Sequence, residues 1–115
     1  MLIVDDNVDA ARILGLLLKQ TGYEVHLAHD GPNGLERVRS LHPDVVILDI
    51  GLPRMDGFEV ARAVRQETAI PLIAITGYGP EEGTSSLFNH YLVKPVDPAR
   101  LTTILGELIP SPARS

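Results

Sequence analysis

Four short apolar runs recur along the chain, and each stops at a polar side chain. The runs are Leu2–Val4, Val45–Leu48, Leu72–Ile75 and Tyr91–Val93, and the residues that follow them are Asp5, Asp49, Thr76 and Lys94. Uninterrupted runs of this length are typical of parallel strands that are buried on both faces. Because the carboxyl ends of parallel strands meet at one edge of the sheet, where ligands bind, these four polar residues are predicted to gather there.

The segments between the runs have helical spacing. The first helix is expected to follow Asn7, which is suited to cap it, and to end at Gly22. Its predicted buried face is Ala10, Ile13, Leu14, Leu17 and Leu18. A second helix opens at Gly31 and closes before Pro43. Its apolar positions are Leu35, Val38 and Leu41.

Two further helices are predicted in the second half of the chain. Asp56 followed by Glu59 resembles a capping box at the start of the third helix. The buried positions of that helix are Val60, Ala61 and Val64. Asp97 followed by Pro98 is a strong start signal for the last helix, which Pro110 ends. Its apolar stripe is Leu101, Ile104, Leu105 and Leu108.

The segment Tyr23–Ala28 differs from the four runs because its apolar and polar residues alternate. Alternation predicts a strand that is wetted on one face, which suits the border of the sheet. Strands that alternate with helices predict βαβ units with right-handed crossovers. We therefore expect an α/β protein in three layers, with a parallel sheet between two layers of helices.

The chain has 115 residues, a formal net charge of -5, 44% hydrophobic residues and no cysteine. This length fits one domain, which we place at residues 1–110, with residues 111–115 as a tail or linker. The negative charge opposes binding to nucleic acid or anionic membranes. The lack of cysteine excludes disulfides and thiolate zinc sites. No stretch is long and apolar enough to span a membrane and no signal peptide is visible, so a cytoplasmic location is expected.

Asp5 and Asp6 are adjacent at the end of the first predicted strand. Two neighbouring carboxylates repel each other unless a cation or a shared proton relieves them. In an arbitrary chain such a pair is more often a helix cap beside a solvated acid. Asp49 makes a functional site the better interpretation, because it ends a strand that is expected to lie beside the first one. Three converging carboxylates favour a Mg²⁺ site, since Mg²⁺ takes a few carboxylate oxygens and keeps several waters.

Asp49 is either a third metal ligand or a nucleophile that accepts a phosphoryl group as an acyl phosphate. The second role requires cationic and hydrogen-bonding groups near the transferring oxygens. Lys94 provides an ammonium group and Thr76 a hydroxyl at the same predicted edge. Taken singly, Thr76 is equally suited to cap a helix, and Lys94 to lie exposed at a strand end. It is the combination that indicates phosphoryl chemistry.

Four segments resemble the signature motifs of response-regulator receiver domains. They are Leu2–Asn7, Asp49–Gly57, Ile75–Tyr78 and Tyr91–Pro95, which together extend over nearly the whole chain. The resemblance implies a flavodoxin-like (βα)5 fold with a five-stranded parallel sheet in the order 2-1-3-4-5. The residue sequences of the motifs around Asp49, Thr76 and Val93 are similar to those of receivers fused to hybrid sensor histidine kinases.

The resemblance also implies roles for the acids. Asp49 matches the phosphoacceptor, Asp6 a direct Mg²⁺ ligand, and Asp5 an acid that helps to hold the metal largely through water. Gly51 matches the residue whose backbone carbonyl completes the metal site. The implied metal is Mg²⁺, with Mn²⁺ as an alternative.

Three other residues acquire roles through the resemblance. Thr76 matches the hydroxyl that turns toward the phosphoryl group, Lys94 its counter-charge, and Tyr91 the aromatic whose rotamer reports the state. Lys94–Pro95 matches a peptide bond that is usually cis in the family. The implied partner is a sensor histidine kinase or a phosphotransfer protein; nucleic-acid binding and membrane insertion are not expected, and a homodimer stays open. Such a domain is a phosphoacceptor rather than an enzyme, although it supports its own phosphotransfer and dephosphorylation.

One segment departs from the family pattern. Thr76 and Lys94 are 18 positions apart, about one turn of 3.6 residues fewer than the family usually has. Residues 80–90 contain only two large apolar residues, Leu87 and Phe88, and no helical period. Either a few residues are absent from the sequence or the fourth helix is short. A short helix would put the usual output surface in doubt.

Two other functions fit part of the pattern. A degenerate receiver that acts only as a binding module is disfavoured because every site residue type is present, although a short fourth helix keeps it open. An aspartyl-nucleophile phosphatase also combines Asp, Thr, Lys and Mg²⁺, but it needs a second Asp two residues after the nucleophile. That position is Gly51 when counted from Asp49 and Asn7 when counted from Asp5, so the general acid is absent.

The four histidines are scattered and form neither a metal pair nor a helix-centred phosphohistidine site. We expect them to be surface or edge residues. They are His26, His29, His42 and His90.

Overall fold

The computed structural model describes residues 1–50, 57–76, 88–93 and 96–108. Within these residues five strands form a parallel sheet in the order β2-β1-β3-β4-β5. The strands are β1 (Leu2–Val4), β2 (His26–Ala28), β3 (Val46–Asp49), β4 (Leu72–Thr76) and β5 (His90–Val93). The helices are α1 (Val8–Gln20), α2 (Gly31–Leu41), α3 (Gly57–Glu67) and α4 (Pro98–Leu108). The predicted α/β class and strand order are confirmed.

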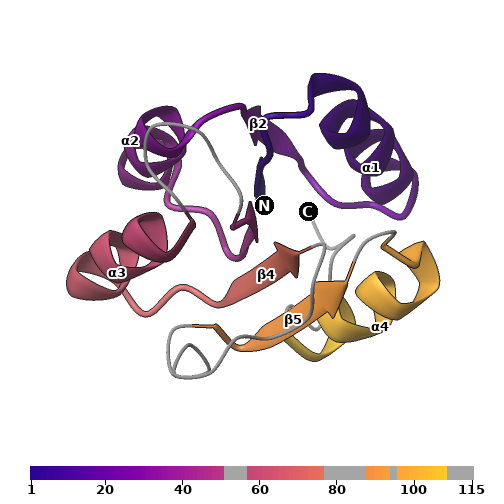
Figure 1. Ribbon diagram of the computed structural model, residues 1–115. Helices are drawn as coiled ribbons and strands as arrows, with labels where there is room; N and C mark the ends of the chain where they lie inside the picture. Colours follow the sequence, from indigo (N-terminus) through magenta and orange to yellow (C-terminus); the bar gives the residue numbers. More distant parts are fainter. Residues whose placement is uncertain (51–56, 77–87, 94–95, 109–115) are drawn as a thin grey trace.

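The sheet lies between two pairs of helices, with α1 and α4 on one face and α2 and α3 on the other (Figure 1). Successive residues of a strand point to opposite faces. Ile3 and Ile47 therefore belong to the core under α1 and α4, whereas Val4 and Leu48 belong to the core under α2 and α3. This burial on both faces explains why the apolar runs are uninterrupted.

β2 is the border strand that its alternating pattern predicts, but it is shorter than expected. Only His26–Ala28 pair with β1, in register with Leu2–Val4. A strand can pair only along the length of its neighbour, and β1 has three residues. Tyr23 and Val25 precede β2 and are buried under α1 instead.

The buried face of α1 is not the one predicted. Its buried residues are Ala11, Gly15 and Leu18, while Ile13 is 62% exposed and Leu17 is 38% exposed. Ala10 is exposed and Leu14 is half-buried, so of the predicted face only Leu18 is fully buried.

Small residues decide how α1 is turned. A Cβ atom at Gly15 would lie 3.4 Å from the side chain of Val25 and 3.5 Å from that of Leu27, so the helix backbone runs close to β2. The face that carries Ala11 and Gly15 allows this close approach, and dense packing there gains more dispersion contact than a bulkier face would. Ile13 and Leu17 are consequently turned away from the core.

The helix ends agree with the capping residues in the sequence. The side chain of Asn7 accepts a hydrogen bond from the Ala10 N–H at 3.0 Å, and Gly22 has a φ of 101°, the left-handed conformation that favours glycine. Asp30 caps α2 by accepting from the Asn33 N–H at 2.8 Å. Of the predicted core positions in the last two helices, Val60, Ala61, Val64, Leu101, Ile104 and Leu105 are buried, whereas Leu108 is half-buried.

Several expectations fall on residues outside the described ranges. They concern the cap at Asp56, a short helix between β4 and β5, the Lys94–Pro95 peptide bond and the tail at 111–115. None of the helices in the described ranges has the length and apolar character that a membrane span requires.

Candidate functional site

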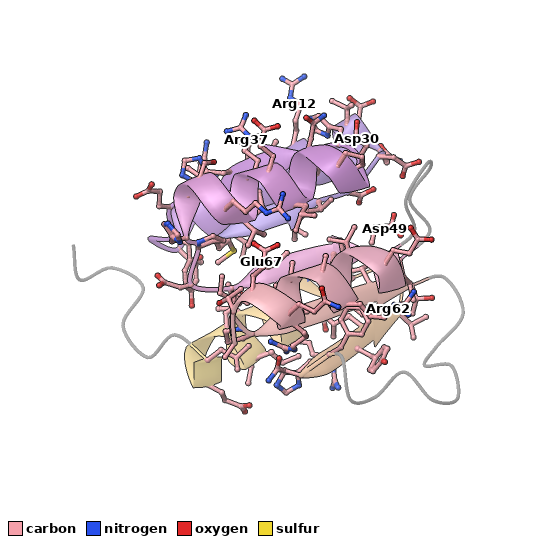
Figure 2. The ribbon with its side chains drawn as sticks, turned by 90° about the vertical axis from the view of Figure 1, so that its left-hand side faces the viewer. Arg12, Asp30, Arg37, Asp49, Arg62 and Glu67 are labelled. Atoms are coloured by element: carbon pink, nitrogen blue, oxygen red, sulfur yellow. The ribbon has the colours of Figure 1, made fainter. Side chains whose placement is uncertain are left out.

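The pairing of β1 with β3 brings Asp5 and Asp49 together. Val4 is the register partner of Leu48, so the next residue of each strand lies at the carboxyl edge of the sheet. Asp5, Asp6 and Asp49 each offer a carboxylate oxygen within 4.8 Å of the others. Figure 2 shows Asp49 at the same end of the molecule as Asp30, where β2 gives way to α2.

The burial of this cluster is unusual for charged residues. Asp5 and Asp49 are each 6% exposed and Thr76 is 5% exposed, whereas Asp6 is exposed. Across the described ranges, the buried polar or charged side chains are those of Asp5, Asp49 and Thr76. Buried carboxylates cost folding free energy unless partners compensate them. Their concentration at one edge of the sheet makes this edge the candidate functional site.

Asp5 is held at three of its polar groups. Its side-chain Oδ1 accepts from the Asn7 N–H at 2.9 Å, and its own N–H donates to the Ala28 carbonyl at 3.0 Å. Its backbone carbonyl lies 3.1 Å from Nδ1 of His29. Hydrogen bonds with the residue that caps α1 and with the end of β2 thus hold Asp5 in place, whereas the neighbouring Asp6 is exposed to solvent.

His29 was missed as a site residue by the sequence reasoning. It is exposed, as expected of a surface residue, yet its ring contacts the backbone between Asp5 and Asp6. Its position directly after β2 was the available signal, because that position lies at the same edge of the sheet as Asp5.

Thr76 ends β4 at this edge. Asp49 is the register partner of Ile75, and the Ile50 N–H donates to the Ile75 carbonyl at 3.2 Å, so Thr76 follows directly after the pair. Tyr91 lies in β5 opposite Ala74, half-buried. Its ring packs edge-on against Phe88, with the centroids 5.4 Å apart and the planes at 61°. Lys94 and Gly51 lie outside the described ranges.

An apolar groove of about 600 Å³ opens beside the acids. Ile13 and Leu17 line it from α1, and Val96 and Pro98 line it from the start of α4. Asp5 belongs to both the groove and the acid cluster. The site therefore combines a hard-oxygen cluster with an accessible apolar surface.

The oxygen donors of the cluster suit a hard divalent cation. Mg²⁺ is bound through one or two carboxylates, retains water and accepts phosphate oxygens as further ligands. Asp5, Asp6 and Asp49 are the described residues that could hold such an ion. A carboxylate beside the ion could also act as a nucleophile toward a phosphoryl group.

Comparisons with known proteins agree with this geometry. The family model for the response regulator receiver domain matches residues 1–106. The probable transcriptional regulator ycf27 of Cyanophora paradoxa is 35% identical over 113 residues, which are 95% of this chain and 47% of that protein. The response regulator ArlR of Staphylococcus aureus is 38% identical over 101 residues, 84% of this chain and 46% of that protein. The chain spans about half the length of these curated relatives.

Solved structures show the same likeness. The chemotaxis protein CheY4 of Vibrio cholerae has a TM-score of 0.86 at 30% identity, covering 94% of this chain and 96% of that one. The receiver domain of the Francisella response regulator 1452 has a TM-score of 0.86 at 25% identity, covering 93% of each chain. Receiver domains of this kind interact with histidine kinases or phosphotransfer proteins in two-component signalling. The chain belongs to the response-regulator receiver family.

Proposed function

We propose that Asp49 accepts a phosphoryl group from the phosphohistidine of a sensor histidine kinase or phosphotransfer protein. The observation that supports this most directly is the buried Asp49 carboxylate beside two further acids at the carboxyl edge of the sheet. A carboxylate oxygen of Asp49 attacks phosphorus in line and forms an O–P bond while the P–N bond breaks. The electron pair of that bond returns to the imidazole nitrogen of the donor. No general base is needed, because a carboxylate nucleophile, unlike a hydroxyl, has no proton to lose.

The acid cluster would hold the metal that this reaction requires. Asp6 and Asp49 would be direct ligands, Asp5 would act largely through water, and the Gly51 backbone carbonyl would complete the site. Mg²⁺ held there, or Mn²⁺ in its place, would neutralise charge on the phosphoryl oxygens. The convergence of three carboxylates within 4.8 Å supports this assignment.

Thr76 and Lys94 would complete the charge balance. Thr76 is the register partner of Val93, and Lys94 follows Val93 in the sequence. We assign to the Thr76 hydroxyl a hydrogen bond to the phosphoryl group and to the Lys94 ammonium its counter-charge. Tyr91 would change its rotamer when Thr76 moves, which would couple phosphorylation to the surface around β5 and α4.

A partner that presents a phosphohistidine to Asp49 must cover the carboxyl edge of the sheet. The groove beside Asp5 lies at that edge, and its apolar wall carries the exposed Ile13 and Leu17. Exposed apolar residues next to a reactive group are suited to contact a protein partner. With a histidine kinase shown to phosphorylate the wild type, Ile13→Glu should slow transfer from the kinase and leave transfer from acetyl phosphate unchanged.

The experiment that tests the proposal is intact mass spectrometry after incubation with Mg²⁺ and acetyl phosphate. We expect the mass of one phosphoryl group to be added to the wild type and to Asp44→Asn, a matched control at an exposed residue two positions before β3. Asp49→Asn should add none. A hydroxylamine-labile phosphate retained by Asp49→Asn would refute the assignment.

If Mg²⁺ binds but no adduct forms, a degenerate receiver that only binds partners is favoured. A phosphatase is disfavoured because Gly51 occupies the position where it would need a second Asp. We place the domain at residues 1–110 with a tail at 111–115, in a cytoplasmic protein without direct contact to nucleic acid; a homodimer stays open.

A further inference from the structure

His29 extends the connection between β1 and β2 beyond their regular pairing. That pairing ends with Val4 opposite Ala28. One more backbone bond follows, from the Asp5 N–H to the Ala28 carbonyl at 3.0 Å. The next contact comes from a side chain, since Nδ1 of His29 lies 3.1 Å from the Asp5 carbonyl oxygen. A carbonyl oxygen can only accept, so Nδ1 carries the proton in this contact.

The carbonyl that His29 contacts belongs to the peptide group between Asp5 and Asp6. A peptide group is planar, so holding its oxygen also holds the direction in which the chain enters Asp6. Asp5 is already fixed by burial and by its bond from the Asn7 N–H. Asp6 is exposed and has no such packing, so the placement of its carboxylate depends more strongly on the backbone.

We propose that His29 is a positioning residue for the metal centre, acting through its Nδ1–H bond to the Asp5 carbonyl to orient Asp6. This inference rests on the proposed Mg²⁺ site. Mg²⁺ demands near-ideal octahedral geometry, so a ligand that is poorly aligned lowers its affinity. Partners outside the ligand shell that orient ligands commonly contribute at least tenfold to metal affinity. His29 would act from the position directly after β2, 24 residues along the chain from the carbonyl that it holds.

The test compares two substitutions that differ in one donor group. His29→Asn keeps an N–H at the same number of bonds from the backbone as Nδ1, whereas His29→Leu keeps a similar branched shape without a donor. His26→Leu is the matched control, because His26 lies at the opposite end of β2, where its ring contacts the exposed Glu24. Mg²⁺ dissociation constants are measured by titration while following backbone amide shifts in ¹⁵N NMR spectra.

We expect His29→Leu to raise the Mg²⁺ dissociation constant about tenfold, with His29→Asn and His26→Leu close to the wild type. In the metal-free wild type, long-range ¹H–¹⁵N spectra of the ring should show the proton on Nδ1. Equal affinities for the wild type and His29→Leu would overturn the role of His29, as would equal losses in His29→Leu and His29→Asn. Absence of Mg²⁺ binding by the wild type would instead refute the proposed function, and with it the metal role of His29.

Discussion

Asp5 and Asp49 end adjacent parallel strands whose preceding residues are register partners, and their carboxylate oxygens lie within 4.8 Å of each other. Asp6 lies within the same distance. Negative charges this close repel, and the repulsion is stronger where burial lowers the effective dielectric constant. The site is thus built at a cost in stability that a bound cation would remove.

Neutralising Asp6 should therefore stabilise the metal-free protein. For Asp6→Asn we expect the free energy of unfolding to rise by about 0.5–1 kcal/mol, a small gain because Asp6 is exposed and screened. Mg²⁺ should stabilise the wild type, since a ligand of the native state alone shifts the equilibrium toward it, and should stabilise Asp6→Asn less. Urea denaturation with Mg²⁺ and with a chelator measures both effects. Glu36→Gln, at an exposed acid of α2, should behave as the wild type. A metal-free Asp6→Asn less stable than the wild type would show that repulsion among the three acids does not limit stability.

Gly34 of α2 packs against β1 without room for a side chain. A Cβ atom there would lie 2.9 Å and 3.0 Å from the two methyl groups of Val4. Gly34→Ala should lower the free energy of unfolding by about 1–3 kcal/mol, because overpacking outweighs the gain in helix propensity. Gly106→Ala in α4 is the control, since nothing lies within 4 Å of its Cβ position, and it should be stabilising. Thermal unfolding followed by circular dichroism compares the two, and equal effects would contradict this account.

Asn89 joins the start of β4 to the start of β5 through its backbone N–H and its side-chain Oδ1. Its N–H donates to the Leu72 carbonyl at 2.8 Å, and its Oδ1 accepts from the Leu72 N–H at 2.9 Å and from Arg65 at 2.7 Å. Asn89→Ala leaves the Leu72 N–H without that acceptor, which should cost about 1–2 kcal/mol in chemical denaturation. Asn33→Ala, on the exposed start of α2, should cost less. A loss no larger than that of the control would show that water replaces the Asn89 amide.

The pair Arg39–Glu67 links α2 to α3 and should make stability depend on pH. Arg39 donates from Nε to Oε1 at 3.0 Å and from Nη2 to Oε2 at 2.6 Å. The hydrogen bond lowers the pKa of Glu67 below its ordinary value of 4.5. Because the folded-state pKa is the lower one, the stabilisation is present above pH 4.5 and is lost as pH falls through the folded-state pKa. A ¹³C NMR titration should show the pKa of Glu67 rising in Arg39→Gln but not in Arg37→Gln; an unchanged pKa in Arg39→Gln would exclude the bond in solution.

Much of the fold was readable in the sequence because it depends on local patterns. Strands buried on both faces must be apolar at every position, so the runs before Asp5, Asp49 and Thr76 identified central strands and the edge that they share. Alternation identified β2 as the border strand, and Asn7 marked a helix start because its side chain replaces a missing backbone acceptor. The predicted convergence of the three acids followed from these patterns together with the strand order.

Tertiary structure alone decided which face of α1 is buried and which side chains support the acids. α1 carries leucine or isoleucine around most of its circumference, so periodicity could not distinguish its faces; close packing of Ala11 and Gly15 on the sheet did. The contact of His29 with the Asp5 carbonyl depends on the exact register of two strands, as does the link between Asn89 and Leu72. Such contacts join residues far apart in the chain, and no local pattern encodes the distance between them.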